Sequence, residues 1–291
     1  MSGGRRGPRQ FEVPKYTSPA RPAQEKNLPP PLSKLLASVP KPPKIDPKSP
    51  ETDPESPQEV PVLRVSVPHP WNVPYAEARA IQERLRARVI PRGGPKSIRL
   101  VAGADVSYDK SHDRFYAAVV VMDFPQLHVI ETVTATGRAE FPYIPGLLTF
   151  REGPILLDAF SRLTLTPDLV IFDGQGIAHP RGFGLAAHMG LILDRPSIGC
   201  AKTRLCGEYR EPGPNVSDYT PLTYDGRIIG SVVRTRARVK PVFVSVGHRI
   251  SLAAARRWVV SCLRGYRLPQ PTRLAHVTVN RLRVNARLKG G

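Results

Sequence analysis

The chain has 291 residues, which is enough for one large domain or two small ones. Its 43 Lys and Arg residues against 24 Asp and Glu give a formal net charge of +19, which favours a polyanionic partner such as nucleic acid, although an arginine-rich composition alone gives the same excess. No stretch approaches ~18 consecutive apolar residues, so a membrane span is not expected, and MSGGRRGPRQ at the start lacks the apolar run of a secretory signal.

The three cysteines also limit the possible classes. Cys200, Cys206 and Cys262 are odd in number and lack the paired spacing of a zinc site or a disulfide framework. They predict a reducing, cytoplasmic compartment.

Prolines are concentrated at the start of the chain, where 15 of the 33 lie between Pro8 and Pro61. Aromatic and β-branched residues are rare there, so the segment buries too little apolar surface to offset its ordering entropy. We expect residues 1–65 to be a disordered, Pro-rich, basic tail and residues 66–291 to be the folded domain.

The first elements of that domain are a helix and three strands. Ile81, Leu85 and Val89 recur every fourth residue, which predicts an amphipathic helix ended by Pro91. The next three runs, SIRLVAGADVSY, RFYAAVVVMDF and LHVIETVTATG, have strand character and short links, which favour an antiparallel meander.

Helices and strands then alternate. The apolar run in PDLVIFDGQG is typical of a strand buried on both faces. Other strands are expected at PSIGCAK, RIIGSVVRT and PVFVSVGH, and helices at 150–163, at 185–193, after Ser251 and from Pro271. This order predicts the α/β class with a mixed sheet flanked by helices.

Three acidic residues occupy positions suited to chemistry. Asp105 lies inside an apolar strand, Asp173 ends the buried strand LVIFD, and Glu152 lies near the start of the intervening helix. Carboxylates in such places need a counter-charge, and three hard oxygen donors suit Mg²⁺ or Mn²⁺, which can activate water and neutralise a phosphodiester. The simpler alternatives are a satisfied strand residue for Asp105 and a helix-dipole acid for Glu152.

Other polar residues fit the same site. Lys202 ends the strand IGCAK, where it can steady a phosphate, and DGQG exposes backbone N–H groups just before His179. His276 lies in a helix, where a single histidine is more often a packed residue than a catalyst.

The segment FPYIPG places Tyr143 and Ile144 between Pro142 and Pro145, which predicts a stiff loop with an apolar tip. Such a wedge can part stacked bases and flip one out, although the loop can equally be a plug of the core.

These segments, in this order, resemble the endonuclease V family. The resemblance covers about residues 71–283 and rests on GADVSY, FPYIPGLLTFREGP, PDLVIFDGQGIAHPRGFGLAAHMG, IGCAKTRL, VGHRIS and PTRLAH. It implies a ribonuclease H-like fold, and it does not extend to the Pro-rich tail, whose removal is expected to spare the chemistry.

The resemblance also assigns roles to individual residues. It implies metal binding by Asp105, Glu152 and Asp173, and a catalytic site completed by Lys202 and His276. It implies a strand-separating wedge at residues 142–145. The implied pocket for a flipped hypoxanthine is formed by Gly146, Leu148, Gly174, Gly176, His179, Gly184 and Leu205.

The activity implied is Mg²⁺-dependent cleavage, with Mn²⁺ as a substitute, at the second phosphodiester bond 3′ to deoxyinosine in DNA. The expected enzyme is a cytoplasmic monomer with no membrane partner. Three alternatives stay open from the sequence: an inosine-specific endoribonuclease of the same family, a non-catalytic nucleic-acid-binding module, and another ribonuclease H-like nuclease. No family catalytic position is substituted, which argues against the second.

Overall fold

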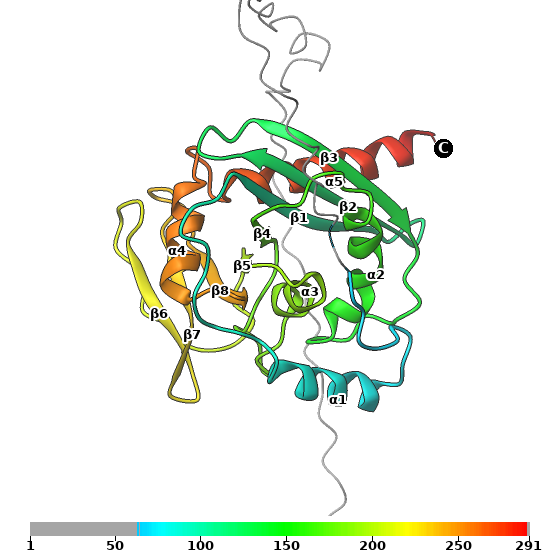
Figure 1. Ribbon diagram of the computed structural model, residues 1–291, viewed down its shortest axis with the longest axis horizontal. Helices are drawn as coiled ribbons and strands as arrows, with labels where there is room; N and C mark the ends of the chain where they lie inside the picture. Colours follow the sequence, from blue (N-terminus) through cyan, green and yellow to red (C-terminus); the bar gives the residue numbers. More distant parts are fainter. Residues whose placement is uncertain (1–62, 64, 290–291) are drawn as a thin grey trace, which may run out of the picture. The chain divides into compact units, whose positions relative to one another are not determined.

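The computed structural model describes residue 63 and residues 65–289, so nearly all of the predicted disordered tail lies outside the described residues. Within them, an eight-stranded mixed sheet is flanked by five helices (Figure 1). The helices are α1 (Tyr75–Arg86), α2 (Leu148–Phe160), α3 (Leu185–Leu193), α4 (Leu252–Ser261) and α5 (Gln270–Lys289). No helix of this described part is both long enough and apolar enough to cross a membrane.

The sheet has the order β3-β2-β1-β4-β5-β8-β7-β6. Its strands are β1 (Leu100–Asp109), β2 (Arg114–Asp123), β3 (Val129–Gly137), β4 (Leu169–Phe172), β5 (Ser197–Ala201), β6 (Tyr219–Tyr224), β7 (Arg227–Val233) and β8 (Val242–His248). The pairs β1–β4 and β4–β5 are parallel, and the other neighbours are antiparallel. The predicted meander and the predicted ribonuclease H-like mixed sheet are confirmed.

Two helix boundaries differ from the prediction. Helix α1 ends at Arg86 rather than reaching Pro91. The next residues form a tighter turn, in which Arg88 N–H donates to the Leu85 carbonyl (2.9 Å), and Ile90 N–H then donates to His248 Nδ1 (3.3 Å). Helix α2 begins at Leu148 and ends at Phe160, two residues earlier at its start and three residues earlier at its end than predicted. The helix opened by Ser251 has the expected cap, since the Ser251 hydroxyl accepts from Ala254 N–H.

Strand β6 was not predicted, because its sequence YTPLTY contains a proline. Pro221 lacks an N–H group, and β6 lies at the sheet edge, where a strand tolerates that loss. The signal that identifies the hairpin is the turn Asp225–Gly226, whose residues both have positive φ (48° and 70°), as a two-residue hairpin turn requires.

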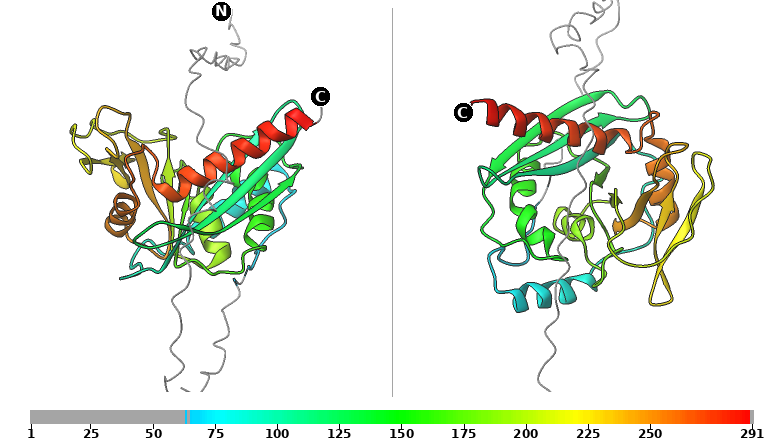
Figure 2. Two further views of the ribbon diagram at one scale, coloured as in Figure 1. Left: turned by 90° about the horizontal axis from the view of Figure 1, so that it is seen from above. Right: turned by 180° about the vertical axis from the view of Figure 1, so that it is seen from behind.

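Helices cover the sheet on both faces. Helices α4 and α5 pack with Val101, Leu169 and Ile171 on one face, and α2 and α3 pack with Ala102 and Ala104 on the other. Helix α5 runs across β1 and β2, as the two views in Figure 2 show. Because side chains alternate along a strand, Gly103 and Asp105 of β1 both face α5.

Gly103 sets how closely α5 approaches the sheet. A Cβ atom at this position would overlap the backbone of Pro271 in the first turn of α5. The absence of a side chain therefore lets α5 rest directly on β1, two residues before Asp105. This contact fixes the height of α5 above the strand.

We predict that Gly103→Ala destabilises the fold by about 1–3 kcal/mol, because an added methyl group overpacks a backbone contact that cannot yield. It should also lower activity, since α5 carries His276. Gly137→Ala is the matched control, because its Cβ would meet only the end of the Ile155 side chain. Urea unfolding and activity assays check both variants, and equal behaviour of the two would contradict the role given to Gly103.

Candidate metal centre and adjoining cavity

The register of β1 and β4 brings Asp105 and Asp173 together. Ala104 is paired with Phe172, and the Asp173 N–H donates to the Ala104 carbonyl (3.0 Å). Asp105 and Asp173 are therefore the next residues on two adjacent parallel strands. Their side chains are 8% and 9% exposed, so two carboxylates lie buried at the end of β4.

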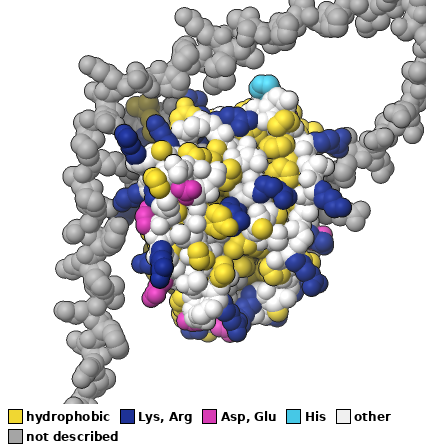
Figure 3. Space-filling view, turned by 90° about the vertical axis from the view of Figure 1, so that its left-hand side faces the viewer, with side chains coloured by type: hydrophobic (Ala, Val, Ile, Leu, Met, Phe, Trp, Pro, Cys, Tyr) yellow, Lys and Arg dark blue, Asp and Glu magenta, His cyan; other side chains and the backbone are white. Residues whose placement is uncertain are grey.

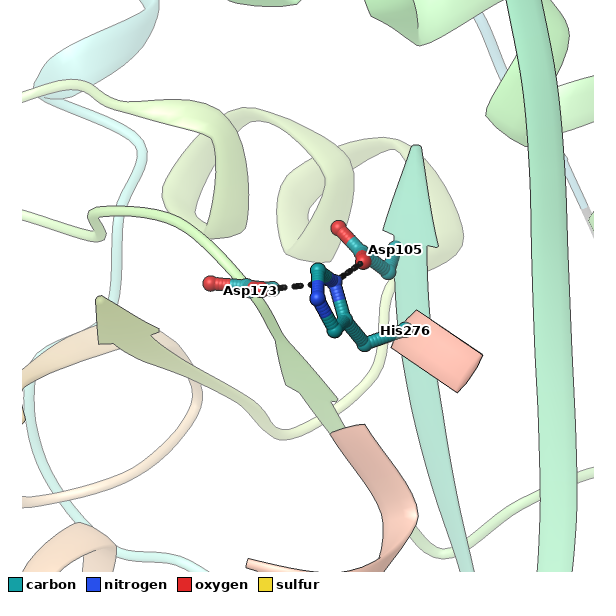
Figure 4. Close-up of side chains that lie close together, drawn as sticks. All are labelled: Asp105, Asp173 and His276. Atoms are coloured by element: carbon teal, nitrogen blue, oxygen red, sulfur yellow. Dashed lines mark hydrogen bonds and ion pairs between the residues drawn. The ribbon is translucent and has the colours of Figure 1, made fainter. Parts of the chain in front are cut away.

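Helix α5 and strand β5 supply two more groups to this point. His276 Nδ1 lies 2.7 Å from Asp105 Oδ2 and 4.0 Å from Asp173 Oδ2 (Figure 4). Lys202, directly after β5, pairs its ammonium group with Asp173 and lies 3.2 Å from His276 Nδ1. The structure thus gathers four of the five predicted catalytic side chains into direct contact.

Asn280 orients the imidazole of His276 and was not found from the sequence. Its amide nitrogen contacts His276 Nε2 (3.0 Å) and the His276 carbonyl (2.9 Å), and its oxygen accepts from Arg283 (3.1 Å). An amide N–H donated to Nε2 leaves the ring proton on Nδ1, where it is donated to Asp105. The only sequence signal is the spacing of four residues along a helix, which is common in any helix.

Glu152 lies close to this group but outside the direct contacts. Burial, followed by the charges of Asp105 and Asp173, raises the pKa of Glu152 to about 8. Glu152 is the fifth residue of α2, and the first turn holds no acid, so the helix-dipole explanation considered for it is wrong. Its carboxyl group instead lies close enough to Asp105 and Asp173 for their charges to raise its pKa.

The donor set fits a divalent cation. Asp105 and Asp173 each offer a carboxylate oxygen, and these atoms and a ring nitrogen of His276 all lie within 4.8 Å of one another. Burial, then the Asp105 charge, raises the pKa of Asp173, although Lys202 opposes this shift. A cation among these carboxyl groups would relieve their mutual repulsion, and carboxylate oxygens are the donors that hard cations prefer.

A cavity of about 130 Å³ is lined by residues that lie close to two of these acids in the sequence, since Thr149 precedes Glu152 on α2 and Gln175 follows Asp173. Five of the seven predicted pocket residues line it: Gly146, Leu148, His179, Gly184 and Leu205. The remaining lining residues are Gln82, Tyr143, Ile144, Pro145, Thr149, Gln175 and Leu185. Gln82 and Gln175 were not predicted, since a single glutamine gives no sequence signal.

Gly174 and Gly176 do not line this cavity. A Cβ at Gly174 would press on the Leu185 side chain, and a Cβ at Gly176 would overlap the Val246 carbonyl of β8. These two glycines therefore serve close packing of the DGQG turn against α3 and β8.

The loop 142–145 is partly packed in the core and partly exposed. Ile144 packs against the apolar cluster of α1 and α2 that contains Leu147 and Phe150. Tyr143 is 68% exposed and lines the cavity mouth. Pro142 does not line the cavity. The loop is thus anchored by Ile144, whereas Tyr143 is exposed to solvent.

Known proteins resemble this chain over the same region. A sequence model of the Endonuclease V family matches residues 83–277, which include all five predicted catalytic positions. An Endonuclease V of Roseiflexus castenholzii is 48% identical over 223 residues, covering 76% of this chain and 99% of the relative.

Solved structures agree. The Endonuclease V crystal structure from Streptomyces avermitilis has a TM-score of 0.71 at 41% identity, covering 78% of this chain and 99% of that one. A Ciona intestinalis Endonuclease V, solved with a 23mer DNA containing an inosine followed by a ribo-adenosine, has a TM-score of 0.64 at 26% identity, covering 72% and 97%.

Metal binding at this site predicts a stability change that needs no activity assay. Mg²⁺ or Mn²⁺ added to chelator-treated protein should raise the unfolding free energy, by about 2.7 kcal/mol at 100 times the dissociation constant. Asp105→Asn and Asp173→Asn should lose most of this gain, which differential scanning calorimetry would measure. Asp158→Asn, at an exposed ion pair on α2, is the control. An equal gain in all four proteins would place the cation elsewhere.

Proposed function

This chain belongs to the endonuclease V family, and we propose that it hydrolyses the second phosphodiester bond 3′ to deoxyinosine in DNA, which initiates repair of deaminated adenine. The observation that carries the proposal is the cluster of Asp105, Asp173 and His276, whose two carboxylates also raise the pKa of Glu152, together with a cavity of about 130 Å³ whose lining includes residues close to Glu152 and Asp173 in the sequence. We further propose that the enzyme acts as a monomer in the cytoplasm.

Two segments connect the cavity to the carboxylates. Helix α2 begins with Leu148 and Thr149 at the cavity and carries Glu152 one turn later. The loop after β4 begins with Asp173, and its Gln175 and His179 line the cavity. If a base is held in the cavity, the adjoining sugar-phosphate backbone of the nucleic-acid strand would therefore lie close to the acidic residues.

The proposed cation is Mg²⁺, with Mn²⁺ as a substitute, held by Asp105, Glu152 and Asp173. When bound, such an ion stabilises negative charge on a phosphodiester and lowers the pKa of water. Two further side chains, Lys202 and His276, contact the aspartates. Lys202 places a positive charge beside Asp173, where a phosphate oxygen can be neutralised. His276 donates to Asp105 and keeps that carboxylate oriented.

Recognition of hypoxanthine rests on a small chemical difference from adenine. Hypoxanthine carries an O6 acceptor and an N1–H donor, where adenine has an amino group and a bare nitrogen. Gly146 and Gly184 line the cavity, and because glycine has no side chain, a base can approach the backbone of the cavity wall closely there. A mispaired deoxyinosine also unstacks at lower cost than a paired base, which aids selection.

A basic surface suits a nucleic-acid backbone. On the face that carries α4, β6 and β7, Lys and Arg side chains are more prominent than acidic ones (Figure 3). Exposed members of these elements and their loops include Arg227, Arg236, Arg238, Arg257 and Arg264. Binding through such charges weakens steeply with salt.

The cleavage map of a strand with one deoxyinosine tests the function directly. We expect a single cut at the second 3′ phosphodiester, with 3′-hydroxyl and 5′-phosphate ends, and faster cutting than of a matched inosine RNA strand. Faster cutting of the RNA would favour the endoribonuclease, and equal cutting of an unmodified duplex or a junction would favour a different nuclease.

Removing either buried aspartate should abolish this cleavage. Asp105→Ala and Asp173→Ala should each lower the rate by about a thousandfold or more, because each removes a carboxylate needed to hold the cation. Circular dichroism should show the fold intact, and Asp158→Asn should cut normally. Near-normal cutting by either alanine variant with Mg²⁺ present would contradict the metal site.

Tyr143 gives a test of the wedge. Tyr143→Ala should reduce kcat/KM about tenfold on duplex DNA and less on a single strand, because only the duplex requires bases to be parted at a cost of a few kcal/mol. Tyr266→Ala, at another exposed tyrosine, is the control. An equal loss on both substrates would show that Tyr143 does not separate strands.

A further inference from the structure

The Gly146 carbonyl, at the end of the loop 142–146, accepts from three side chains. Gln82 Nε2 lies 3.0 Å away, His179 Nε2 lies 3.0 Å away and Arg181 Nη2 lies 2.6 Å away. A carbonyl oxygen offers two lone pairs, so three donors saturate it. This point of the loop is therefore held from α1 and from the segment that follows β4.

The three donors also fix one another. Arg181 Nε donates to Gln82 Oε1 (2.6 Å), and the Arg181 backbone N–H donates to His179 Nδ1 (3.1 Å). His179 Nδ1 is thereby an acceptor, which leaves the ring proton on Nε2 for Gly146. Gln82, only 1% exposed, uses its amide nitrogen on the Phe183 carbonyl as well (3.1 Å).

Two further observations show how specific this arrangement is. Gly146 has φ of +79°, and a Cβ there would come within 2.8 Å of Arg181 Nη2, so the guanidinium approaches because residue 146 is glycine. Burial, with the nearby Arg181 charge, lowers the pKa of His179 to about 4. The imidazole is therefore neutral near pH 7 and keeps the pattern of one donor and one acceptor.

We propose that Gln82 and Arg181 are positioning residues that hold the loop 142–146 against the cavity and so determine how strictly the enzyme distinguishes bases. Gln82, Gly146 and His179 line the cavity, and so do Tyr143, Ile144 and Pro145, which precede Gly146 in the loop. Release of Gly146 would let this wall move outward. A wider cavity fits hypoxanthine less closely and rejects other bases less well.

We call the hydrogen bonds from Gln82, His179 and Arg181 to the Gly146 carbonyl the clamp. Hydrogen exchange tests the clamp without any cleavage assay. Peptides covering 142–150 should exchange about tenfold faster in Arg181→Ala and Gln82→Leu, because each change removes hydrogen bonds that hold Gly146, one of them charge-assisted. Arg181→Lys keeps the charge but replaces the two guanidinium nitrogens that bond Gln82 and Gly146 with a single ammonium nitrogen, so the peptides should exchange at an intermediate rate. Arg79→Ala is the control, since Arg79 is an exposed cation near Arg181 and one turn from Gln82.

Thermal unfolding of the full chain separates local loosening from loss of fold. Unchanged exchange at 142–150 in folded Arg181→Ala, or equal acceleration in Arg79→Ala, would overturn the clamp. If Arg181→Ala does not fold, the same comparison is made with Arg181→Lys, which must exchange faster than wild type for the clamp to stand.

Kinetics test the consequence for specificity, which rests on the proposed function. In Arg181→Ala, KM for a deoxyinosine strand should rise about tenfold with kcat within about twofold, and preference over a deoxyadenosine strand should fall about tenfold. Arg181→Lys should recover part of the lost affinity, measured as KM, and part of the lost preference for deoxyinosine. A loosened loop with unchanged preference would overturn the specificity role. Failure of the wild type to prefer deoxyinosine would instead reject the proposed function and leave the exchange result standing.

Discussion

Electrostatic repulsion among buried carboxylates is the constraint on which this structure depends. Asp105 and Asp173 follow paired residues of adjacent parallel strands, and Glu152 is close enough to sense both charges. Such crowding is costly in a protein interior unless positive charge compensates for it. Lys202 and His276 provide part of that compensation, and the donor set fits a divalent cation for the rest. The fold holds together groups that would separate in a flexible chain.

The sheet and its helices position these groups by backbone contacts. Gly103 allows α5 to rest on β1, which brings His276 to Asp105, and Asn280 fixes the direction of the imidazole. Strand β5 is parallel to β4, so Lys202 emerges beside Asp173. A substitution at a packing contact such as Gly103 would therefore also disturb the geometry of the acidic site.

The cavity shares its framework with the acidic site. Helix α2 and the loop after β4 each carry residues of both, so two short, ordered segments set the distance between the cavity and the carboxylates. The loop 142–146 completes the wall, anchored by Ile144 in the core and by the Gly146 carbonyl. Under the proposed function, these shared segments would couple base recognition in the cavity to hydrolysis at the carboxylates.

The sequence alone determined the elements and the acidic residues. Periodicity and turn residues located every described strand but β6, whose Pro221 is tolerated only because the strand lies at an edge, a fact of sheet order. Asp105, Asp173 and Lys202 were recognisable because charged residues within or at the end of apolar strands are rare. Asn280, Gln82 and Arg181 were not, because their roles depend on partners up to 101 residues away. Only the packing of α1, α5 and the loops brought those hydrogen-bond partners together, and ordinary polar side chains carry no local pattern that foretells them.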